Sequence, residues 1–380
     1  MLGFGKKILD LDAPLNDGAA LRERLHAALR KVPCAPIADD IVEAGIVAGL
    51  RTDKEGLTIE LLLPTPALKG RRALEQSVLD TARRIVDVNV RLEVTSKVRM
   101  SASSPDGKQD LPGIANVILV ASGKGGVGKS TVTVNLAIAL AETGARVGLM
   151  DADVYGPCIP LMMGAQDERP YTKGNKIIPI QRFGVQLMSL GFLLEEGQAV
   201  LWRGPMVAGT VKQLLADVDW GTLDYLLVDL PPGTGDAPMS LAQLVPLTGV
   251  LIVSTPHNVA ANIAGKAVQL FQRLNSPILG VVENMGPYID EDTGKEVRMF
   301  HGTDGDELAK VLKVPFLGRI PFDSRISKAG DAGVPSMITH PHTEQAEGFR
   351  HIAGQVAQQS SIIAMTRRDL TRLSEAPAKA

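Results

Sequence analysis

The residues best suited to chemistry form a glycine-rich loop, G-K-G-G-V-G-K-S, at positions 123–130. Its glycines let backbone N–H groups turn inward around a β-phosphate. Lys129 places a charge against the β- and γ-phosphates, and the hydroxyl of Ser130 is suited to reach Mg²⁺. The loop therefore predicts a nucleotide site, whose phosphate-binding residues are Gly123, Lys124, Gly125, Gly126, Val127, Gly128, Lys129, Ser130 and Thr131.

Two carboxylates follow a second apolar run. Asp151 and Asp153 come directly after the strand expected at Val147–Met150. Carboxylates at the carboxyl end of a parallel strand lie beside the phosphate site, where both would help to arrange magnesium. The structural alternative is an aspartate that caps the next turn. Their combination with the glycine-rich loop favours the functional role.

A third acidic position ends the run Y-L-L-V-D, and it resembles a Walker B strand. Asp229 would hold a magnesium-bound water there. The segment L-P-P-G-T-G-D follows, and its Gly233 and Gly235 would let a backbone N–H approach the γ-phosphate and move after hydrolysis. This spacing predicts a switch that converts phosphate loss into a loop rearrangement.

Three further polar features are open to more than one interpretation. Asn284 ends the run V-V-E-N-M, and its amide suits an adenine edge, although an ordinary Asx turn explains it as well. His340 and His342 could suggest a metal site, but the proline between them and the lack of nearby acids favour a surface loop. The acidic run at 290–292 is typical of a solvated hairpin tip.

The elements around the loop fit an open, mostly parallel α/β sheet. The run N-V-I-L-V-A at 116–121 predicts a buried strand, residues 130–142 predict a helix, and Gly144 closes that helix. Such a helix points its free N–H groups at the phosphates. Strands alternate with helices to about residue 359, a pattern typical of a sheet covered on both faces. The expected strands are Val117–Ala121, Val147–Met150, Tyr225–Val228, Gly249–Val253 and Ile278–Val282.

The N-terminal residues differ in pattern and predict a small, separate α+β domain at 1–100. Its expected order is α-β-β-α-β, with elements near 19–31, 44–50, 57–63, 74–86 and 88–94. A polar segment rich in Ser, Pro and Gly predicts a linker at 101–113. The nucleotide domain is then expected at 114–360, followed by a C-terminal tail at 361–380 that forms a short helix or frays. A solvated tail is favoured over a membrane-surface helix, because the segment is short and weakly apolar.

Composition limits the classes of partner. The chain has 380 residues, 45% of them hydrophobic but only 4% aromatic, and a net charge of −2. Without a basic block or many aromatic side chains, a nucleic-acid partner is not expected. No apolar stretch approaches a membrane span and the N-terminus lacks a signal-peptide core, so we expect a cytoplasmic protein without stable membrane insertion. The only two cysteines, Cys34 and Cys158, exclude a disulfide framework and a four-cysteine site within one chain.

Taken together, these motifs resemble the Mrp family of P-loop ATPases, which are iron–sulfur cluster carriers related to MinD and ParA. The resemblance covers nearly the whole chain and rests on V-A-S-G-K-G-G-V-G-K-S, D-A-D-V-Y-G-P, R-G-P-M-V, D-W-G-T-L-D-Y and G-V-V-E-N-M. The N-terminal domain resembles the small MIP18-like domain often fused to Mrp proteins. The resemblance implies a deviant Walker A fold and a homodimer that binds ATP and Mg²⁺ and hydrolyses ATP slowly.

The resemblance also implies individual roles. Lys124 would reach across a dimer interface to the nucleotide of the partner subunit, as the signature lysine does in deviant Walker A ATPases. Asp153 would orient the attacking water, and Asp229 would belong to the magnesium shell together with Ser130 and Asp151. Asn284, and with it Pro321 in G-R-I-P-F-D, would flank adenine.

One departure from the family concerns its cargo. Cluster carriers of this family place C-x-x-C shortly after V-E-N-M, so that two subunits share a [4Fe–4S] cluster through four thiolates. Here Asp290 and Thr293 stand where those cysteines would lie by count, and oxygen ligands hold such clusters poorly. The segment Thr65–Ala67 also lacks a cysteine often found in relatives of the small domain. Cys158 lies near the nucleotide loop, where a small buried side chain explains it better than a bridging ligand does.

Three functions are therefore expected. The first is an ATP-dependent switch in iron–sulfur cluster assembly or transfer, with ligands borrowed from a partner or client protein. The second is a nucleotide-gated interaction module that has lost cluster binding. The third is a positioning ATPase like MinD or ParA, which the absence of a basic patch and of a clear amphipathic tail disfavours.

Overall fold

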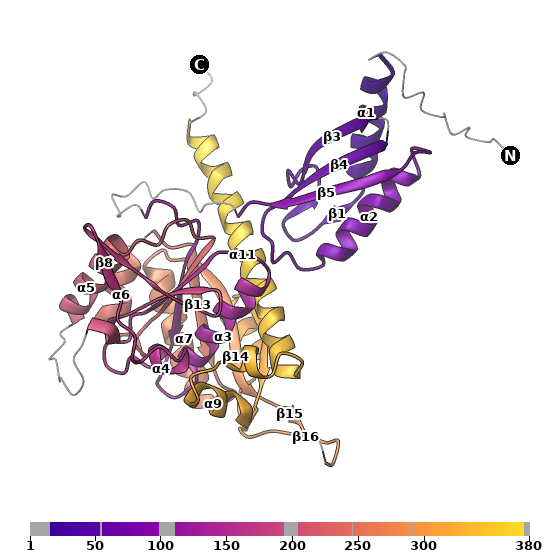
Figure 1. The fold of residues 1–380 in the computed structure, drawn as a ribbon. Helices are drawn as coiled ribbons and strands as arrows, with labels where there is room; N and C mark the ends of the chain where they lie inside the picture. Colours follow the sequence, from indigo (N-terminus) through magenta and orange to yellow (C-terminus); the bar gives the residue numbers. More distant parts are fainter. Residues whose placement is uncertain are drawn as a thin grey trace. The chain divides into compact units, whose positions relative to one another are not determined.

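The computed structural model describes residues 16–53, 55–98, 111–193, 204–244, 246–290 and 292–375. The chain divides into two compact units, Met1–Arg99 and Met100–Ala380 (Figure 1). This division lies near the predicted end of the small domain. Most of the predicted linker, the start of the R-G-P-M-V segment and the last five residues lie outside the described residues.

The N-terminal unit is a three-stranded sheet with two helices and a short hairpin. The strand order is β3-β4-β5; β3 and β4 pair antiparallel, whereas β4 and β5 run parallel because α2 connects them. The hairpin of β1 and β2 was not expected from the sequence, because its strands have only two and three residues. The elements are α1 (Asn16–Leu29), β1 (Pro33–Cys34), β2 (Ala38–Asp40), β3 (Val47–Asp53), β4 (Gly56–Leu63), α2 (Arg71–Arg83) and β5 (Val90–Ser96).

The second unit is built on an eight-stranded sheet in the order β10-β11-β7-β12-β6-β13-β14-β17. All neighbours are parallel except β10 and β11, so the expected open, mostly parallel α/β fold is confirmed. The sheet strands are β6 (Val117–Ser122), β7 (Val147–Asp151), β10 (Ile180–Arg182), β11 (Val185–Ser189), β12 (Tyr225–Asp229), β13 (Gly249–Ser254), β14 (Ile278–Gly286) and β17 (Phe316–Pro321).

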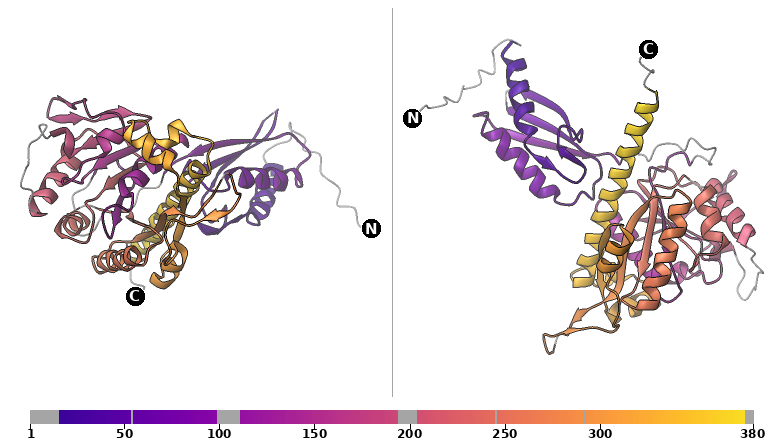
Figure 2. Two further views of the ribbon diagram at one scale, coloured as in Figure 1. Left: turned by 90° about the horizontal axis from the view of Figure 1, so that it is seen from below. Right: turned by 180° about the vertical axis from the view of Figure 1, so that it is seen from behind.

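Helices cover both faces of this sheet (Figure 2), as the continuous apolar runs require. Every residue of β6, β7, β12 and β13 is buried. The helices are α3 (Lys129–Glu142), α4 (Ile159–Met162), η1 (Leu190–Leu193), α5 (Gly204–Asp217), α6 (Asp236–Leu244), α7 (Asn258–Arg273), α8 (Gly305–Leu312), α9 (Ser324–Asp331), α10 (Ser336–Thr339) and α11 (Glu344–Glu375). Two small hairpins complete the unit: β8 (Tyr171–Lys173) with β9 (Lys176–Ile178), and β15 (Tyr288–Ile289) with β16 (Glu296–Val297).

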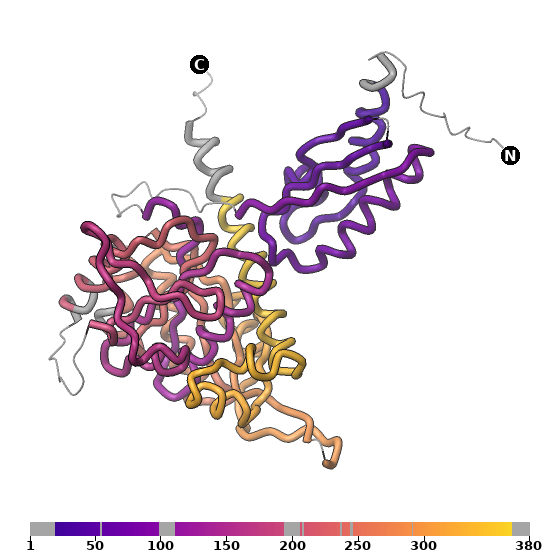
Figure 3. Tube along the Cα trace, in the orientation of Figure 1, coloured from indigo at the N-terminus to yellow at the C-terminus, as the bar shows by residue number. Residues whose placement is uncertain are grey.

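Two differences from the sequence analysis concern the ends of the unit. The five predicted strands are present, but β10, β11 and β17, at the two ends of the sheet, were missed. Polar residues or glycine interrupt their apolar runs, and β10 has only three residues. The boundary predicted at residue 360 falls inside α11, which is one helix of 32 residues, so the helical alternative for the last twenty residues holds as far as Glu375. This helix, whose trace is yellow in Figure 3, packs along β17. A Cβ at Gly318 would lie 2.9 Å from a side-chain carbon of Ile352, so the glycine leaves room for the helix. No helix among the described residues has the length and apolarity that crossing a membrane requires.

Candidate nucleotide site

The sheet brings the predicted site residues to one edge. Strand β12 lies between β6 and β7, so that Asp229 pairs with Val120 on one side and with Asp151 on the other. The glycine-rich loop leaves the end of β6 and leads into α3, which begins at Lys129. Three strand ends and one helix N-terminus therefore meet at the same place, which is the arrangement that favours phosphate binding.

The loop backbone depends on glycine at two close approaches. Gly128 has φ +77°, and a Cβ there would lie 2.2 Å from the amide nitrogen of Asn284. Gly123 lies against the backbone of α7, where a Cβ would come within 2.5 Å of the carbonyl carbon of Ile263. Larger residues at either position would displace the loop from its neighbours.

A buried cluster joins the loop to the Walker B strand. The Nζ atom of Lys129 lies 2.6 Å from Oδ2 of Asp229, and the hydroxyl of Ser130 donates to the same oxygen at 2.5 Å. The hydroxyl of Thr133 donates to Oδ1 of Asp229 at 2.7 Å. Asp229 is fully buried and Lys129 is only 6% exposed, so this ion pair is shielded from water. Lys129 also lies 4.0 Å from Oδ2 of Asp153.

Thr133 was not among the predicted site residues. It lies one helical turn after Lys129, and its hydroxyl oxygen lies 2.8 Å from the carbonyl oxygen of that residue, which therefore shares the single hydroxyl hydrogen with Asp229. A threonine four positions after the loop lysine was the only available signal in the sequence, and its contact with Asp229 depends on how α3 packs against β12.

The two aspartates after β7 have different environments. Asp151 is fully buried, and it accepts hydrogen bonds from the N–H groups of Asp153 and Ile159 at 3.1 and 3.3 Å and from the hydroxyl of Ser189 at 3.1 Å. Burial, and then the charge of Asp229, raise the pKa of Asp151 to about 8. Burial also raises the pKa of Asp153. Asp151 therefore organises the loop that presents Asp153 toward Lys129.

Asn284 and Gly233 fix the loops on either side of the phosphate site. The Nδ2 atom of Asn284 donates to the carbonyl of Val127 at 2.9 Å, so this buried amide supports the glycine-rich loop. The N–H of Gly233 donates to the carbonyl of Ser122 at 2.9 Å, which ties the segment after Asp229 to the end of β6. The role of Asn284 as an adenine contact stays a prediction.

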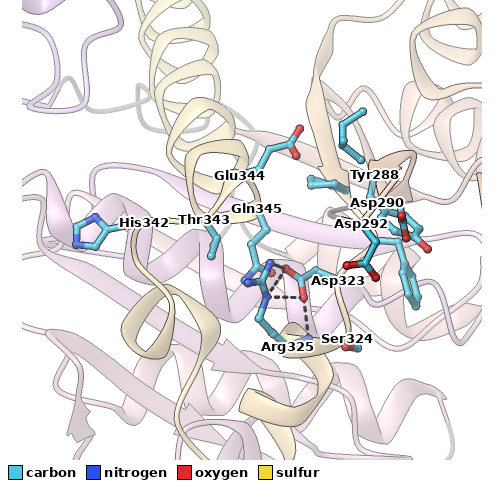
Figure 4. Close-up of a pocket in the computed structure, with 13 residues that line it drawn as sticks. Tyr288, Asp290, Asp292, Asp323, Ser324, Arg325, His342, Thr343, Glu344 and Gln345 are labelled. Atoms are coloured by element: carbon cyan, nitrogen blue, oxygen red, sulfur yellow. Dashed lines mark hydrogen bonds and ion pairs between the residues drawn. The ribbon is translucent and has the colours of Figure 1, made fainter. Parts of the chain in front are cut away.

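Lys124 and Pro321 lie at the two sides of this site. Lys124 is half-buried and forms no ion pair within the described part of the chain, while its carbonyl accepts a hydrogen bond from Ser122 at 3.0 Å. Pro321 ends β17 and lines a cavity of about 820 Å³ together with residues from β15, α9 and the start of α11 (Figure 4). In the sheet, β17 and β6 lie on opposite sides of β14. Pro321, at the end of β17, is therefore separated by β14 from the strand that leads into the loop of Lys124.

The donor set for an iron–sulfur cluster does not fit. Cys34 is buried in the N-terminal unit, and burial raises the pKa of the half-buried Cys158 thiol. The N–H and hydroxyl of Thr293 both donate to Oδ1 of Asp290, at 2.8 and 2.6 Å, so these two side chains close the turn between β15 and β16. Among the residues that the structure describes, no group of three or more His, Cys, Asp or Glu side chains could hold a metal ion.

The fold and the cluster around Asp229 define a P-loop NTPase. A family model described as ParA, NUBPL iron-transfer P-loop NTPase, matches residues 113–357, and the chain belongs to this family. This match confirms the resemblance inferred from the motifs and the assignment of the chain to a family of iron-transfer P-loop NTPases.

Several similar proteins have been named or solved. An iron-sulfur cluster carrier protein of Synechocystis is 38% identical over 343 residues, which is 89% of this chain and 97% of the relative. One from Deinococcus radiodurans is 40% identical over 357 residues, covering 93% and 99%. The nucleotide-binding protein of Archaeoglobus fulgidus, solved in complex with ADP, is 38% identical with a TM-score of 0.55 and covers 63% of this chain and 93% of its own.

Proposed function

We propose that this chain is a Mg²⁺-dependent ATPase that works as a homodimeric switch in iron–sulfur cluster assembly or transfer. The observation that supports this most directly is the buried convergence of Lys129, Ser130 and Asp229 beside a glycine-rich loop. The named relatives are cluster carriers, and the solved relative from Archaeoglobus fulgidus holds ADP. A cytoplasmic location stays a prediction.

The residues present fit Mg²⁺–ATP. The hydroxyl of Ser130 donates to Oδ2 of Asp229, and these two side chains would hold the ion. The ion would neutralise charge at the β- and γ-phosphates. Lys129 would exchange its pairing with Asp229 for the phosphates. Asp153 would accept a hydrogen bond from the attacking water, while Asp151 keeps the Asp153 backbone in place. Asp151 would also belong to the magnesium shell.

The dimer is proposed from Lys124. Its ammonium has no ion-pair partner within the described residues, although it lies in the loop that binds phosphate. A lysine that reaches the nucleotide of the partner subunit would stabilise charge on the transferred phosphoryl group in trans, as an arginine finger does. ATP binding would then promote association of two subunits.

An iron–sulfur cluster would be the cargo of this protein. Asp290 and Thr293 are hydrogen-bonded to each other, and their oxygen atoms are poor ligands for a [4Fe–4S] cluster. We therefore propose that this hairpin holds no cluster and that thiolates of a client or assembly partner supply the ligands. The same observation favours a second candidate function, a nucleotide-gated interaction module whose output is a protein partner and not a cluster.

One experiment tests the switch and another separates the two functions. Phosphate release from ATP should require Mg²⁺, and light scattering should show a dimer with ATP and a monomer without nucleotide. A protein that releases no phosphate and does not associate with ATP would refute the proposal. Iron and sulfide content after anaerobic reconstitution, alone and with a thiolate-bearing assembly partner, then distinguishes a carrier from a module without cargo.

A further inference from the structure

The cavity beside Pro321 has features that the phosphate site does not use. Its volume is about 820 Å³, and it lies between the ends of β15 and β17 and the starts of α9 and α11. The rings of Tyr288 and Phe322, with centroids 5.9 Å apart, stand in its wall with Pro321. These flat apolar surfaces suit a planar ring system.

One polar side chain in this cavity lacks a partner. Gln345 is only 1% exposed, and neither its Nε2 nor its Oε1 atom forms a hydrogen bond within the described chain. Buried polar atoms are nearly always paired, and the exceptions point to a ligand or an ordered water. In Figure 4 the side chain of Gln345 extends from the start of α11 toward Asp323 and Arg325, which pair with each other. The amide of Gln345 is therefore available to a molecule that enters the cavity.

The cavity lies within reach of the phosphate loop along β14. Asn284 supports the loop through Val127, and Gly286 follows two residues later, at most about 7 Å away. Gly286 is the register partner of Pro321, and its carbonyl accepts the N–H of Phe322 at 2.9 Å. A nucleotide whose phosphates lie in the loop would extend along β14 toward this cavity.

The charges in the cavity favour the neutral end of a nucleotide. Among the described residues that line it, Arg325 is the one Lys or Arg side chain, and it stands among the carboxylates of Asp290, Asp292, Asp323 and Glu344. Such a lining repels phosphate, which the loop attracts. It leaves the cavity suited to an uncharged base between the apolar walls.

We propose that Gln345 reads the base of the bound nucleotide and sets a preference for adenine over guanine. The inference rests on the proposed ATPase function and assigns base recognition to α11. The Nε2 group would donate to a ring nitrogen of adenine while Oε1 accepts from the exocyclic amino group. On the same edge guanine presents a carbonyl oxygen in place of that amino group, so two acceptors would face each other. The Nδ2 group of Asn284 is already committed to the loop at Val127.

The test compares ATP and GTP affinities of the full chain in three variants. Gln345→Met keeps the length and removes the amide, whereas Gln345→Glu keeps the shape and removes the donor. Gln358→Met is the matched control, because Gln358 is a buried glutamine on the same helix, about 20 Å further along it. The wild type should bind ATP about tenfold or more tighter than GTP. Both changes at Gln345 should weaken ATP and bring the ratio to within about twofold, while the control keeps the wild-type ratio.

The outcomes separate this inference from the proposed function. A wild type that binds neither nucleotide refutes both. A wild type that binds ATP and GTP equally, or a folded Gln345→Met variant with an unchanged ratio, overturns the assignment of Gln345 alone. Photolabelling of the wild type with 8-azido-ATP does not depend on how the variants fold. Label should appear on the peptides that contain residues 321–325 or 342–345 and disappear with excess ATP, and label confined to other peptides would overturn the inference.

Discussion

The phosphate loop is hydrogen-bonded to Asn284 of β14, and the hairpin of β15 and β16 follows β14 in the chain. The two regions differ in how strongly their surroundings restrict which residues can occupy them. Around the loop, Asp229 is fully buried and receives three donors. In the hairpin, Ile289 is 51% exposed and one pair, Asp290 with Thr293, closes the turn. Few residues can replace a member of a buried ion pair, because removing one partner leaves a buried unpaired charge and destabilises the fold. An exposed turn tolerates replacement of cluster ligands by residues that simply satisfy the turn.

The largest effect is expected at Lys124. Lys124→Ala should bind ATP with affinity close to that of the wild type but lose hydrolysis by about 1,000-fold, because its ammonium would contact the nucleotide of the partner subunit, where it stabilises charge on the transferred phosphoryl group and holds the two subunits together. ATP should also no longer induce dimers. Phosphate release and light scattering measure both effects, with Lys266→Ala on the exposed side of α7 as the control. Normal hydrolysis by the variant would remove Lys124 from the site.

Lys129 should affect binding itself. Lys129→Ala removes the charge that pairs with Asp229 at 2.6 Å, and ATP affinity should fall by about 100-fold, the upper range for a hydrogen bond to a charged group. Calorimetric titration with ATP and Mg²⁺ measures this, again beside Lys266→Ala. An affinity equal to that of the wild type would contradict the assignment of the loop.

Asn284 should have a smaller effect. Asn284→Ala deletes the hydrogen bond to Val127 and leaves that buried carbonyl unpaired, so ATP affinity should fall about fivefold to tenfold through a loosened loop. Asn262→Ala, an exposed position on α7, is the matched control. An equal loss of affinity for ATP and GTP would show that Asn284 supports the loop. A loss of affinity confined to ATP would show that Asn284 itself contacts the base.

The hairpin should have the smallest effect on ATP hydrolysis. The double variant Asp290→Cys and Thr293→Cys creates C-x-x-C in an exposed turn. Because Asp290 lines the cavity beside Pro321 but lies outside the cluster around Asp229, phosphate release at saturating ATP should stay within about twofold of the wild type. After anaerobic reconstitution the variant should bind roughly four irons per dimer, as a [4Fe–4S] cluster requires, and the wild type none. Iron in the wild type would show that other ligands hold the cluster.

Sequence reasoning identified the central strands and the loop because each carries its signal locally. The runs that became β6, β12 and β13 are continuously apolar, and the structure buries every residue in them. It missed β17, because Gly318 and Arg319 interrupt its apolar run, and it missed the full length of α11, because this helix carries many polar residues among its apolar ones. The H-P-H segment and the acidic run, which were interpreted as separate surface features, contribute His342 and Asp290 to one cavity.

The sequence by itself determined the phosphate loop, the Walker B strand and the loss of the cluster cysteines, because these are properties of residue type and short spacing. Only the tertiary structure decided which side chains complete the site. Thr133 reaches Asp229 across 96 positions, and Asn284 reaches Val127 across 157. The unpaired amide of Gln345 likewise gains its meaning only from the cavity around it. Such contacts depend on the order of strands in the sheet, which no local pattern specifies.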